Sequence, residues 1–371
     1  MNAPTLTPKP FNRAMLFSGG GLRFGYYLGM YQALCDHDKQ PDIILASCGG
    51  AFVAGLLEVS QDSKQAYERL ISRECYEMLC RIEPNRPKRP TDYALPALAR
   101  YLNSLVNSHA KMRLAHNLLS SHRLSADKLL AKLHAQSLAH IKDESDRHPL
   151  WHWQDYSPNT DFNSIILSSR LLSTYQHQPW QWQLVLRTSH SALADKLENL
   201  SLSNVMANYH VDKIHPTHYI TAEMPLPIAV RGSISDMYYL PPMTWQGQTL
   251  MGGVLNLTPI ELACQLADTV YAETKAGYDG VLAEPAIQDV FGFSPNHRLA
   301  HVHDYQHPHT QIHWLNTADN GKHIRPVIAK KLRLRQGYID VKRPDYATFQ
   351  AIMREQYDYG YERAKDYLGK I

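Results

Sequence analysis

At the start of the chain, short apolar runs alternate with glycine turns and with apolar positions at helical spacing. Ala14–Phe17 is a run typical of a buried strand, and the glycine-rich turn Ser18–Gly21 follows it. In residues 22–35 the apolar side chains recur one helical turn apart, at Phe24, Leu28, Tyr31 and Cys35. This pattern predicts a strand, a tight turn and a helix, in that order.

A second unit of the same kind follows directly. Asp42–Ala46 is predicted to be a strand, Ser47–Gly50 a tight turn, and Ala51–Val59 the beginning of a helix. Two strand–turn–helix units in such close succession indicate an α/β fold with a parallel sheet flanked by helices. Ligands of such sheets bind beyond the carboxyl ends of the strands. We therefore expect the two glycine turns to line one crevice.

The rest of the chain predicts a helical, charged insert and then a return to the sheet. The insert covers about residues 61–160 and is interrupted at 81–90, where three prolines forbid a continuous helix. Four apolar runs downstream are candidate strands: Ser164–Ser168, Trp182–Leu186, His218–Thr221 and Leu299–His303. The chain ends in an amphipathic helix, Tyr346–Leu368.

Composition narrows the class of protein without naming a ligand. The 371 residues are 44% hydrophobic and 20% charged, as in ordinary globular proteins. A net charge of +3 is too small to argue for nucleic acid, although it is compatible with loose attraction to an anionic membrane surface. No apolar run reaches signal-peptide or membrane-spanning length, which predicts a cytoplasmic protein, with contact at the inner membrane face left open. The five cysteines lack paired spacing and are interpreted as reduced thiols.

The first glycine turn has the composition of an anion-binding loop. Gly19, Gly20 and Gly21 would let the backbone approach a ligand closely, and the following helix would point its free amides at the same spot. The turn is neither a P-loop nor a dinucleotide fingerprint, because no Gly-Lys-Ser/Thr follows and Phe24 stands where the last glycine should be. A plain tight turn is the alternative interpretation.

The second turn has the form of a nucleophile elbow. In such an elbow the reactive residue sits on a strained strand-to-helix turn, with small residues two positions before and after it. Ala46 and Gly50 are those small residues, so the presented side chain is Cys48. Choosing Ser47 instead would put the bulky Leu45 at the tight position.

With these motifs in order, the sequence resembles the patatin-like phospholipase family. That family carries a GGGxR/K loop, a GxSxG elbow about thirty residues later and a distant DGGxxxNxP motif. The corresponding segments here are Gly19–Arg23, Ala46–Gly50 and Met251–Pro259. The resemblance covers roughly residues 12–260.

The resemblance implies a three-layer α/β fold and a lipid or acyl ester ligand. The main domain would cover residues 12–320, with the helical insert at about 61–160, and residues 321–371 would add a strand and a helix to it. In the family an elbow serine attacks an ester, the aspartate of DGG is its base, and the glycine loop holds the oxyanion. Position by position, Cys48 takes the nucleophile position and Met251 that of the base. Gly19, Gly20, Gly21, Arg23 and Gly49 correspond to the oxyanion loop and ligand contacts, and Ala46, Gly50, Gly252 and Gly253 support the motifs.

The residues Cys48 and Met251, at the positions of the family's nucleophile and base, lead to alternative functional hypotheses. A thioether cannot accept a proton, so Met251 would remove general-base help worth about 10²–10⁴-fold. The leading hypothesis is a family member of lipid metabolism that binds a lipid or acyl ligand with weak or no hydrolysis. The alternative is an active acyl hydrolase or acyltransferase that uses Cys48, whose pKa a helix N-terminus would lower. A third hypothesis is an interaction protein whose glycine loop only makes a turn.

Other groups could replace the base. Asp236 lies near the third motif in sequence, and histidines are abundant at 297–313. His301 and His303, on a predicted strand, would share one face and could ligate a metal. Clustered surface histidines are the more ordinary explanation, so no metal and no cofactor is expected.

Overall fold

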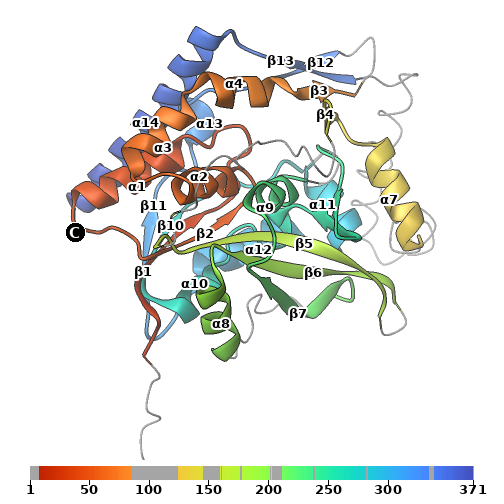
Figure 1. Cartoon of the computed structure of the whole chain (residues 1–371), viewed down its shortest axis with the longest axis horizontal. Coiled ribbons are helices and arrows are strands. Elements are labelled where there is room, and N and C mark those ends of the chain that lie inside the picture. The colour runs from red at the N-terminus through yellow and green to blue at the C-terminus, as the bar shows by residue number, and fades with distance from the viewer. Residues whose placement is uncertain are drawn as a thin grey trace, which may run out of the picture.

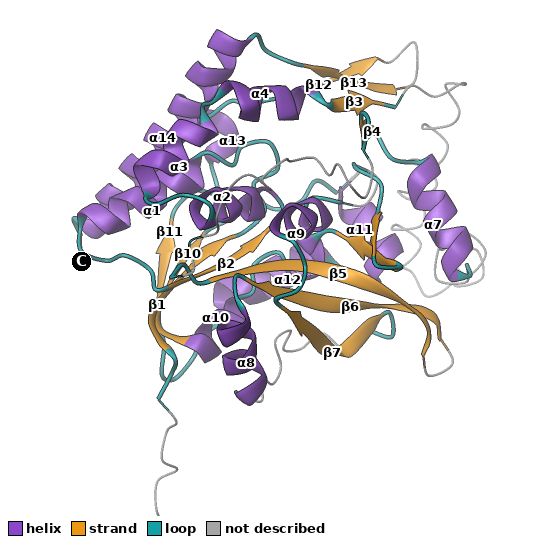
Figure 2. Ribbon diagram, in the orientation of Figure 1, coloured by secondary structure: helices purple, strands orange, loops and turns teal. Residues whose placement is uncertain are grey.

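A mixed sheet with helices on both faces organises the chain (Figures 1 and 2). The computed structural model describes residues 8–85, 124–144, 159, 161–175, 178–200, 202, 211–236, 239–280, 283–333 and 338–370. The strands are β1 (Phe11–Phe17), β2 (Ile43–Ser47), β3 (Ile82–Pro84), β4 (Ala139–Ile141), β5 (Ser164–Tyr175), β6 (Gln178–Thr188), β7 (Ile214–Thr221), β8 (Met243–Trp245), β9 (Gln248–Met251), β10 (Ala267–Glu273), β11 (Gln311–Leu315), β12 (Ala329–Arg333) and β13 (Tyr338–Lys342).

The helices lie between these strands along the chain. They are α1 (Tyr26–Asp36), α2 (Gly49–Glu58), α3 (Ser63–Leu70), α4 (Arg73–Cys80), α7 (Ala126–Ala135), α8 (Ser191–Asn199), α9 (Leu226–Ser233), the 3₁₀ turn η4 (Gly253–Asn256), α10 (Ile260–Leu266), α11 (Ala283–Phe291), α12 (Pro295–Asp304), α13 (Asn320–His323) and α14 (Tyr346–Leu368).

The main sheet is parallel through its centre. Its order is β11-β10-β1-β2-β5-β6-β7, and only β5 and β6 along this path are antiparallel. The short β9 runs antiparallel to β5, with β8 beside it. The predicted α/β fold with a mostly parallel sheet is therefore confirmed.

Alternate residues of the central strands feed two separate apolar cores. Met15 and Phe17 belong to the core under α1, α2, α9 and α14, whereas Ala14 and Leu16 belong to the core under α8, α10, α11 and α12. Because both faces are covered, the strand is apolar at successive positions rather than at every second one. This explains why β1 and β2 stand out in the sequence as short continuous apolar runs.

One predicted strand is wrong. Leu299–His303 lies inside the helix α12, where Ser294 caps the first turn by accepting a hydrogen bond from the His297 amide and Pro295 occupies the first turn. The buried residues of α12 are Pro295, Arg298 and Val302, which is helical spacing. The alternation of histidines with other residues in this segment therefore does not reflect a strand.

The described residues include part of the expected insert and most of the C-terminal segment. Of the insert, α3, α4 and α7 are helical as predicted, while residues 86–123 and 145–158 lie outside the described ranges. The C-terminal segment contains the antiparallel pair β12–β13 and α14, which runs along α1 in Figure 1. The proposed domain boundaries at 12, 320 and 321 stay a prediction.

Two glycines allow α1 and α14 to touch backbone to backbone. A side chain on Gly29 would overlap the Tyr357 carbonyl, and one on Gly360 would overlap the Tyr26 carbonyl. The buried Gln356 of α14 also accepts a hydrogen bond from the Gly25 amide at 2.9 Å. The C-terminal helix thereby holds the start of α1, directly behind the first glycine turn.

This contact gives a stability prediction. Gly360→Ala should lower the free energy of unfolding by about 1–3 kcal/mol, because an added methyl group cannot fit between the two helices. The matched control is Gly321→Ala in α13, where nothing lies within 4 Å of the added atom. We expect the control to be neutral or slightly stabilising. Urea unfolding of both variants, followed by circular dichroism, would contradict the arrangement if Gly360→Ala behaved like the control.

Candidate active site

Cys48 occupies the corner between β2 and α2. Its backbone has φ 50° and ψ −124°, a conformation that costs a residue with a side chain roughly 1–3 kcal/mol. The strand-to-helix elbow expected at this position is therefore present, and Cys48 is the residue at its apex. Ser47 is fully buried and donates its hydroxyl proton to the Leu257 carbonyl at 2.6 Å, so it is not the presented side chain.

The corner folds in this way because its neighbours have small or absent side chains. A Cβ on Gly50 would overlap the Phe17 carbonyl, and one on Gly49 would lie 2.6 Å from the Gly21 carbonyl oxygen. Ala46 is fully buried beside them. The Cys48 amide donates to the Ser233 hydroxyl at 2.8 Å, which ties the elbow to the end of α9.

The glycine loop, Ser18–Gly21, lies against this elbow. A Cβ built on Gly19 would be 3.0 Å from the Cys48 Cβ, so the two predicted turns do meet. Gly21 has φ 57°, which favours glycine. Within the described part of the chain, the amides of Gly19, Gly20 and Gly21 have no hydrogen-bond acceptor. Such amides can stabilise a negatively charged oxygen.

Arg23, predicted beside the oxyanion loop, is anchored to another part of the chain. Its Nε donates to the Ile324 carbonyl at 2.9 Å, and its amide closes the turn by donating to the Gly20 carbonyl at 3.1 Å. The geometry shows Arg23 connecting the loop to the C-terminal segment. A ligand contact of its guanidinium stays a prediction.

The carboxylate beside Cys48 comes from Asp236, which the sequence offered as a replacement for the base that is absent at Met251. The Cys48 thiol donates a hydrogen bond to Asp236 Oδ2 at an Sγ–O distance of 3.0 Å. Met251 is fully buried in the apolar core on one face of the sheet, while its neighbour Leu250 belongs to the core on the other face. Successive side chains of a strand point to opposite faces, and Asp236 reaches the elbow from the segment that follows α9.

The two glycines after Met251 leave room for this arrangement. A side chain on Gly252 would overlap the Asp236 carboxylate, and its amide donates to the Ser235 carbonyl at 2.9 Å. A Cβ on Gly253 would lie 2.7 Å from the Cβ of Ser47, the residue that precedes Cys48. At both positions a side chain would collide with residues around the elbow.

Burial raises the pKa of the Cys48 thiol well above its ordinary value. The negative charge of Asp236 and the hydrogen bond to it act in the same direction, because both favour the neutral thiol. The Gly49 amide and the charge of Lys275 lower the pKa, but by less. This reverses the expectation that the helix N-terminus lowers the pKa of Cys48, because burial and the neighbouring carboxylate outweigh the helix amide.

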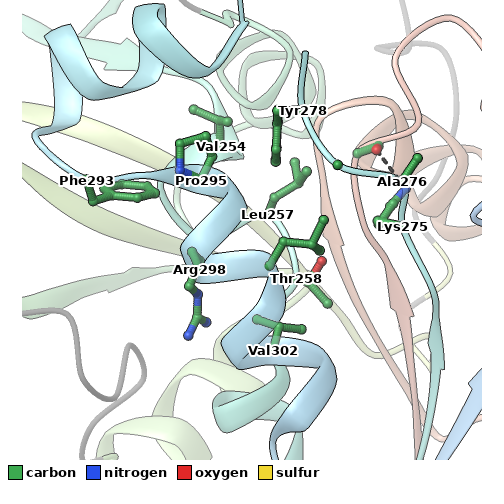
Figure 3. Close-up of a pocket in the computed structure, with 13 residues that line it drawn as sticks. Val254, Leu257, Thr258, Lys275, Ala276, Tyr278, Phe293, Pro295, Arg298 and Val302 are labelled. Carbon is green, nitrogen blue, oxygen red and sulfur yellow. Dashed lines mark hydrogen bonds between the residues drawn. The ribbon is translucent and has the colours of Figure 1, made fainter. Parts of the chain in front are cut away.

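A mostly apolar cavity of about 120 Å³ adjoins the glycine loop at Gly19 (Figure 3). Gly19 lies in its wall, and Gly19 also borders Cys48. The other residues that line it are Val254, Leu257, Thr258, Lys275, Ala276, Gly277, Tyr278, Phe293, Pro295, Arg298, Leu299 and Val302. Arg298 of this lining forms an ion pair with the buried Glu261, so its charge is already balanced.

The histidine segment 297–313 lacks the strand geometry that the alternative of a metal site required. His301 and His303 are two residues apart on a helix and point in different directions, so the shared strand face does not exist. His313 lies on β11 and stacks on Tyr271 at a ring distance of 5.0 Å. Among the described residues, no group of three or more His, Cys, Asp or Glu side chains could hold a metal ion.

The sequence interpretation missed two residues that touch the candidate site. Ser233 accepts the Cys48 amide, and Lys275 donates to the Gly19 carbonyl at 2.7 Å. Neither residue stands in a motif, and each reaches the site from a distant segment. Asp236 was a possible replacement base only because it precedes the third motif.

No described helix is both long enough and apolar enough to cross a membrane.

Comparisons with known proteins give the family. A model of the family described as patatin-like phospholipase matches residues 15–264, which is more than half of the chain. No curated protein matches the chain. Among solved structures, VipD from Legionella pneumophila has 13% identity and a TM-score of 0.33, covering 97% of this chain and 67% of VipD. The type III effector protein ExoU has 13% identity and a TM-score of 0.26, covering 96% of this chain and 54% of ExoU.

The ExoU–SpcU complex from the type III secretion system of Pseudomonas aeruginosa has 14% identity and a TM-score of 0.24, covering 98% of this chain and 52% of the matched chain. The chain thus spans about half to two thirds of the length of these solved chains. On the family match over residues 15–264, this chain belongs to the patatin-like phospholipase family.

Proposed function

We propose that this chain is a lipid acyl hydrolase or acyltransferase in which Cys48 is the nucleophile and Asp236 its base. The observation that carries the proposal is the hydrogen bond from the Cys48 thiol to Asp236, at 3.0 Å, on a strained strand-to-helix corner. A nucleophile within hydrogen-bond reach of a base, beside backbone amides that have no acceptor among the described residues, is the minimum arrangement for acyl transfer. The geometry thus favours the alternative functional hypothesis over the leading one.

In the first half of the proposed reaction, the thiol attacks the carbonyl carbon of an ester while its proton passes to Asp236. The carbonyl oxygen becomes an oxyanion, which the amides of Gly19, Gly20 and Gly49 would stabilise. The tetrahedral intermediate then collapses and expels the alcohol, which takes the proton from Asp236. The acyl group remains on Cys48 as a thioester.

The second half transfers the acyl group to water or to another hydroxyl compound. Asp236 removes a proton from the acceptor as its oxygen attacks the thioester carbon, and the same amides hold the new oxyanion. Collapse returns the proton to sulfur and releases a fatty acid or a new ester. A raised thiol pKa is compatible with this scheme, because a neutral thiol only needs to lose its proton during attack.

The cavity supports an acyl substrate. Its walls are mainly aliphatic and aromatic, and they include Gly19, whose backbone borders Cys48. A volume of about 120 Å³ is comparable to engineered apolar cavities that accept a benzene-sized molecule, so it suits a short apolar portion of an acyl chain. Contact with a membrane surface is part of this proposal, since lipid esters are located there.

The binding-only hypothesis remains the second candidate. Its support is the same raised pKa of Cys48, which leaves little thiolate at neutral pH. Under this hypothesis the cavity holds an acyl ligand, and the thioester either does not form or is not released.

Acylation by p-nitrophenyl butyrate separates the two candidates. The active enzyme should release p-nitrophenol, Cys48→Ala should abolish the release, and Asp236→Asn should slow it by about 10²–10⁴-fold because the general base is removed. Asp195→Asn, at an exposed position of α8, is the matched control and should leave the rate unchanged. Absence of any Cys48-dependent release from folded wild-type protein would favour the binding-only hypothesis.

The pH dependence of Cys48 alkylation tests the contact with Asp236. The folded-state pKa is raised, so iodoacetamide should react slowly at pH 8 and faster only as the pH rises toward that pKa. In Asp236→Asn the rate at pH 8 should increase by about tenfold or more, since a neighbouring charge shifts a pKa by roughly 1–3 units. The modified residue is identified by peptide mass mapping, with Cys75 as the internal control. Equal rates in both proteins would mean that no carboxylate faces the thiol.

A third experiment asks which residue occupies the position of the base. Cys48→Ser alone should give a turning-over esterase, because Asp236 is already in place to accept the hydroxyl proton. Met251→Asp should instead lower stability by several kcal/mol, since it puts an unpaired carboxylate into an apolar core. Thermal unfolding and ester hydrolysis are measured on both variants. If Cys48→Ser were inactive and only the double variant Cys48→Ser/Met251→Asp hydrolysed esters, position 251 would hold the base.

A further inference from the structure

Lys275 lies just beyond the end of β10 and points toward the glycine loop. β10 is parallel to β1, with Met15 paired to Tyr271, so both strands end at the same edge of the sheet. The glycine loop follows β1 at that edge, and Lys275 follows β10. Only 9% of the lysine side chain is exposed.

The Lys275 ammonium binds the carbonyl side of the loop. It donates to the Gly19 carbonyl at 2.7 Å, and the Ser18 carbonyl lies 3.4 Å away. Figure 3 shows the bond from Lys275 as a dashed line at the border of the cavity. Two consecutive carbonyls of the loop are thus turned toward one cation.

Lys275 is itself held by a buried polar cluster. Glu273 is fully buried and lies 2.6 Å from the ammonium, which balances its charge. Both Tyr26 and Tyr27 donate their hydroxyl protons to Glu273, and Thr317 does so at 3.2 Å. The two tyrosine oxygens also accept from Lys275, at 3.1 and 2.9 Å. The position of the ammonium is therefore fixed from several sides.

Because the peptide bond is planar, the direction of each loop carbonyl fixes the direction of the amide of the next residue. In a trans peptide the carbonyl of one residue and the amide of the next point in opposite directions. Turning the Gly19 carbonyl toward Lys275 turns the Gly20 amide away from it, and the Ser18 carbonyl does the same for the Gly19 amide. These amides have no acceptor among the residues described, and Gly19 borders Cys48.

We propose that Lys275 is a positioning residue that aims the Gly19 and Gly20 amides at the oxyanion formed above Cys48. The inference rests on the acyl-transfer function proposed above. Lys275 touches neither the ester nor the sulfur in this role. It acts through the two carbonyls, and Glu273 with its tyrosines keeps the ammonium where those carbonyls need it.

The test compares two reactions of Cys48 in Lys275→Met, because only one of them forms an oxyanion. Acylation by p-nitrophenyl butyrate should slow by about 10²–10³-fold, the usual effect of losing an oxyanion donor, while the half-saturating ester concentration stays within twofold. Alkylation by iodoacetamide needs no oxyanion and should keep its plateau rate. Both rates are followed over pH and compared at their plateaus, because the charge of Lys275 also affects the pKa of the thiol.

Lys275→Arg should recover much of the acylation rate, since it retains a cation with donors. Lys322→Met, at an exposed position of α13, is the matched control and should behave as wild type. Equal losses in acylation and alkylation plateaus, or an unchanged acylation rate in Lys275→Met, would overturn the positioning role. If Lys275→Met does not fold, Lys275→Gln takes its place with the same expected direction.

A second readout works without any hydrolysis. The chain has only four pairs of consecutive glycines, so protein labelled with carbonyl-¹³C and ¹⁵N glycine gives few correlated amide signals. The Gly20 amide shares its peptide bond with the Gly19 carbonyl, and its resonance should shift in Lys275→Met while the pair at 252–253 stays in place. Inactive wild-type protein with a shifted Gly20 signal would refute the acyl-transfer function but keep the loop contact. An unshifted Gly20 signal would refute the positioning role itself.

Discussion

The site depends on close backbone approach around one strained residue. Cys48 keeps a positive φ because the chain around it is packed too tightly to relax, and that packing is possible only where neighbouring residues lack side chains. Gly50 meets the Phe17 carbonyl, Gly49 meets the glycine loop, and Gly253 meets Ser47. The elbow, the loop and the third motif are therefore a single packing unit, although long stretches of sequence separate them. The sheet register places β1 and β2 side by side, so that both turns emerge at one edge.

Within this unit, the chemistry is decided by what surrounds the sulfur. A thiol at a helix N-terminus in water would be acidified, but here burial and a carboxylate at 3.0 Å both favour the neutral form and outweigh the helix amide. The same carboxylate that raises the pKa can remove the proton during attack, which is the role of a general base. Reactivity would then come from paired proton transfer and a preorganised loop, and much less from a standing thiolate. Lys275 adds a buried cation beside that loop, where it donates a hydrogen bond to the Gly19 carbonyl.

Much of the fold could be predicted because it is encoded locally. The apolar runs of β1 and β2, the glycine turns after them and the spacing of α14 each depend on a few consecutive residues, and the motifs carry the family. The strand predicted at Leu299–His303 was wrong, and the surroundings of Met251 could not be predicted, for a shared reason. Leu299–His303 alternates like a strand, yet a serine cap and a proline just before it begin a helix. Met251 stands where the family has its base, yet strand alternation sends its side chain into the apolar core. In both cases the residue types were compatible with two arrangements: strand or helix at 299–303, and a site or core position for the side chain of Met251. Packing against neighbouring elements determined which arrangement formed.

The sequence by itself determined the α/β class and the two glycine turns that follow the first two strands, with Cys48 in the second, because glycine content and apolar spacing constrain the backbone directly. Only the tertiary structure decided that Asp236 contacts the thiol, that the pKa of the thiol is raised, and that Lys275 donates to a loop carbonyl. These are contacts between segments that lie roughly 190 to 260 residues apart. Their distances follow from strand register and helix packing, and no local pattern of residues records them. Electrostatic effects at a buried site depend on just such distances, so its chemistry could not be derived before the fold was known.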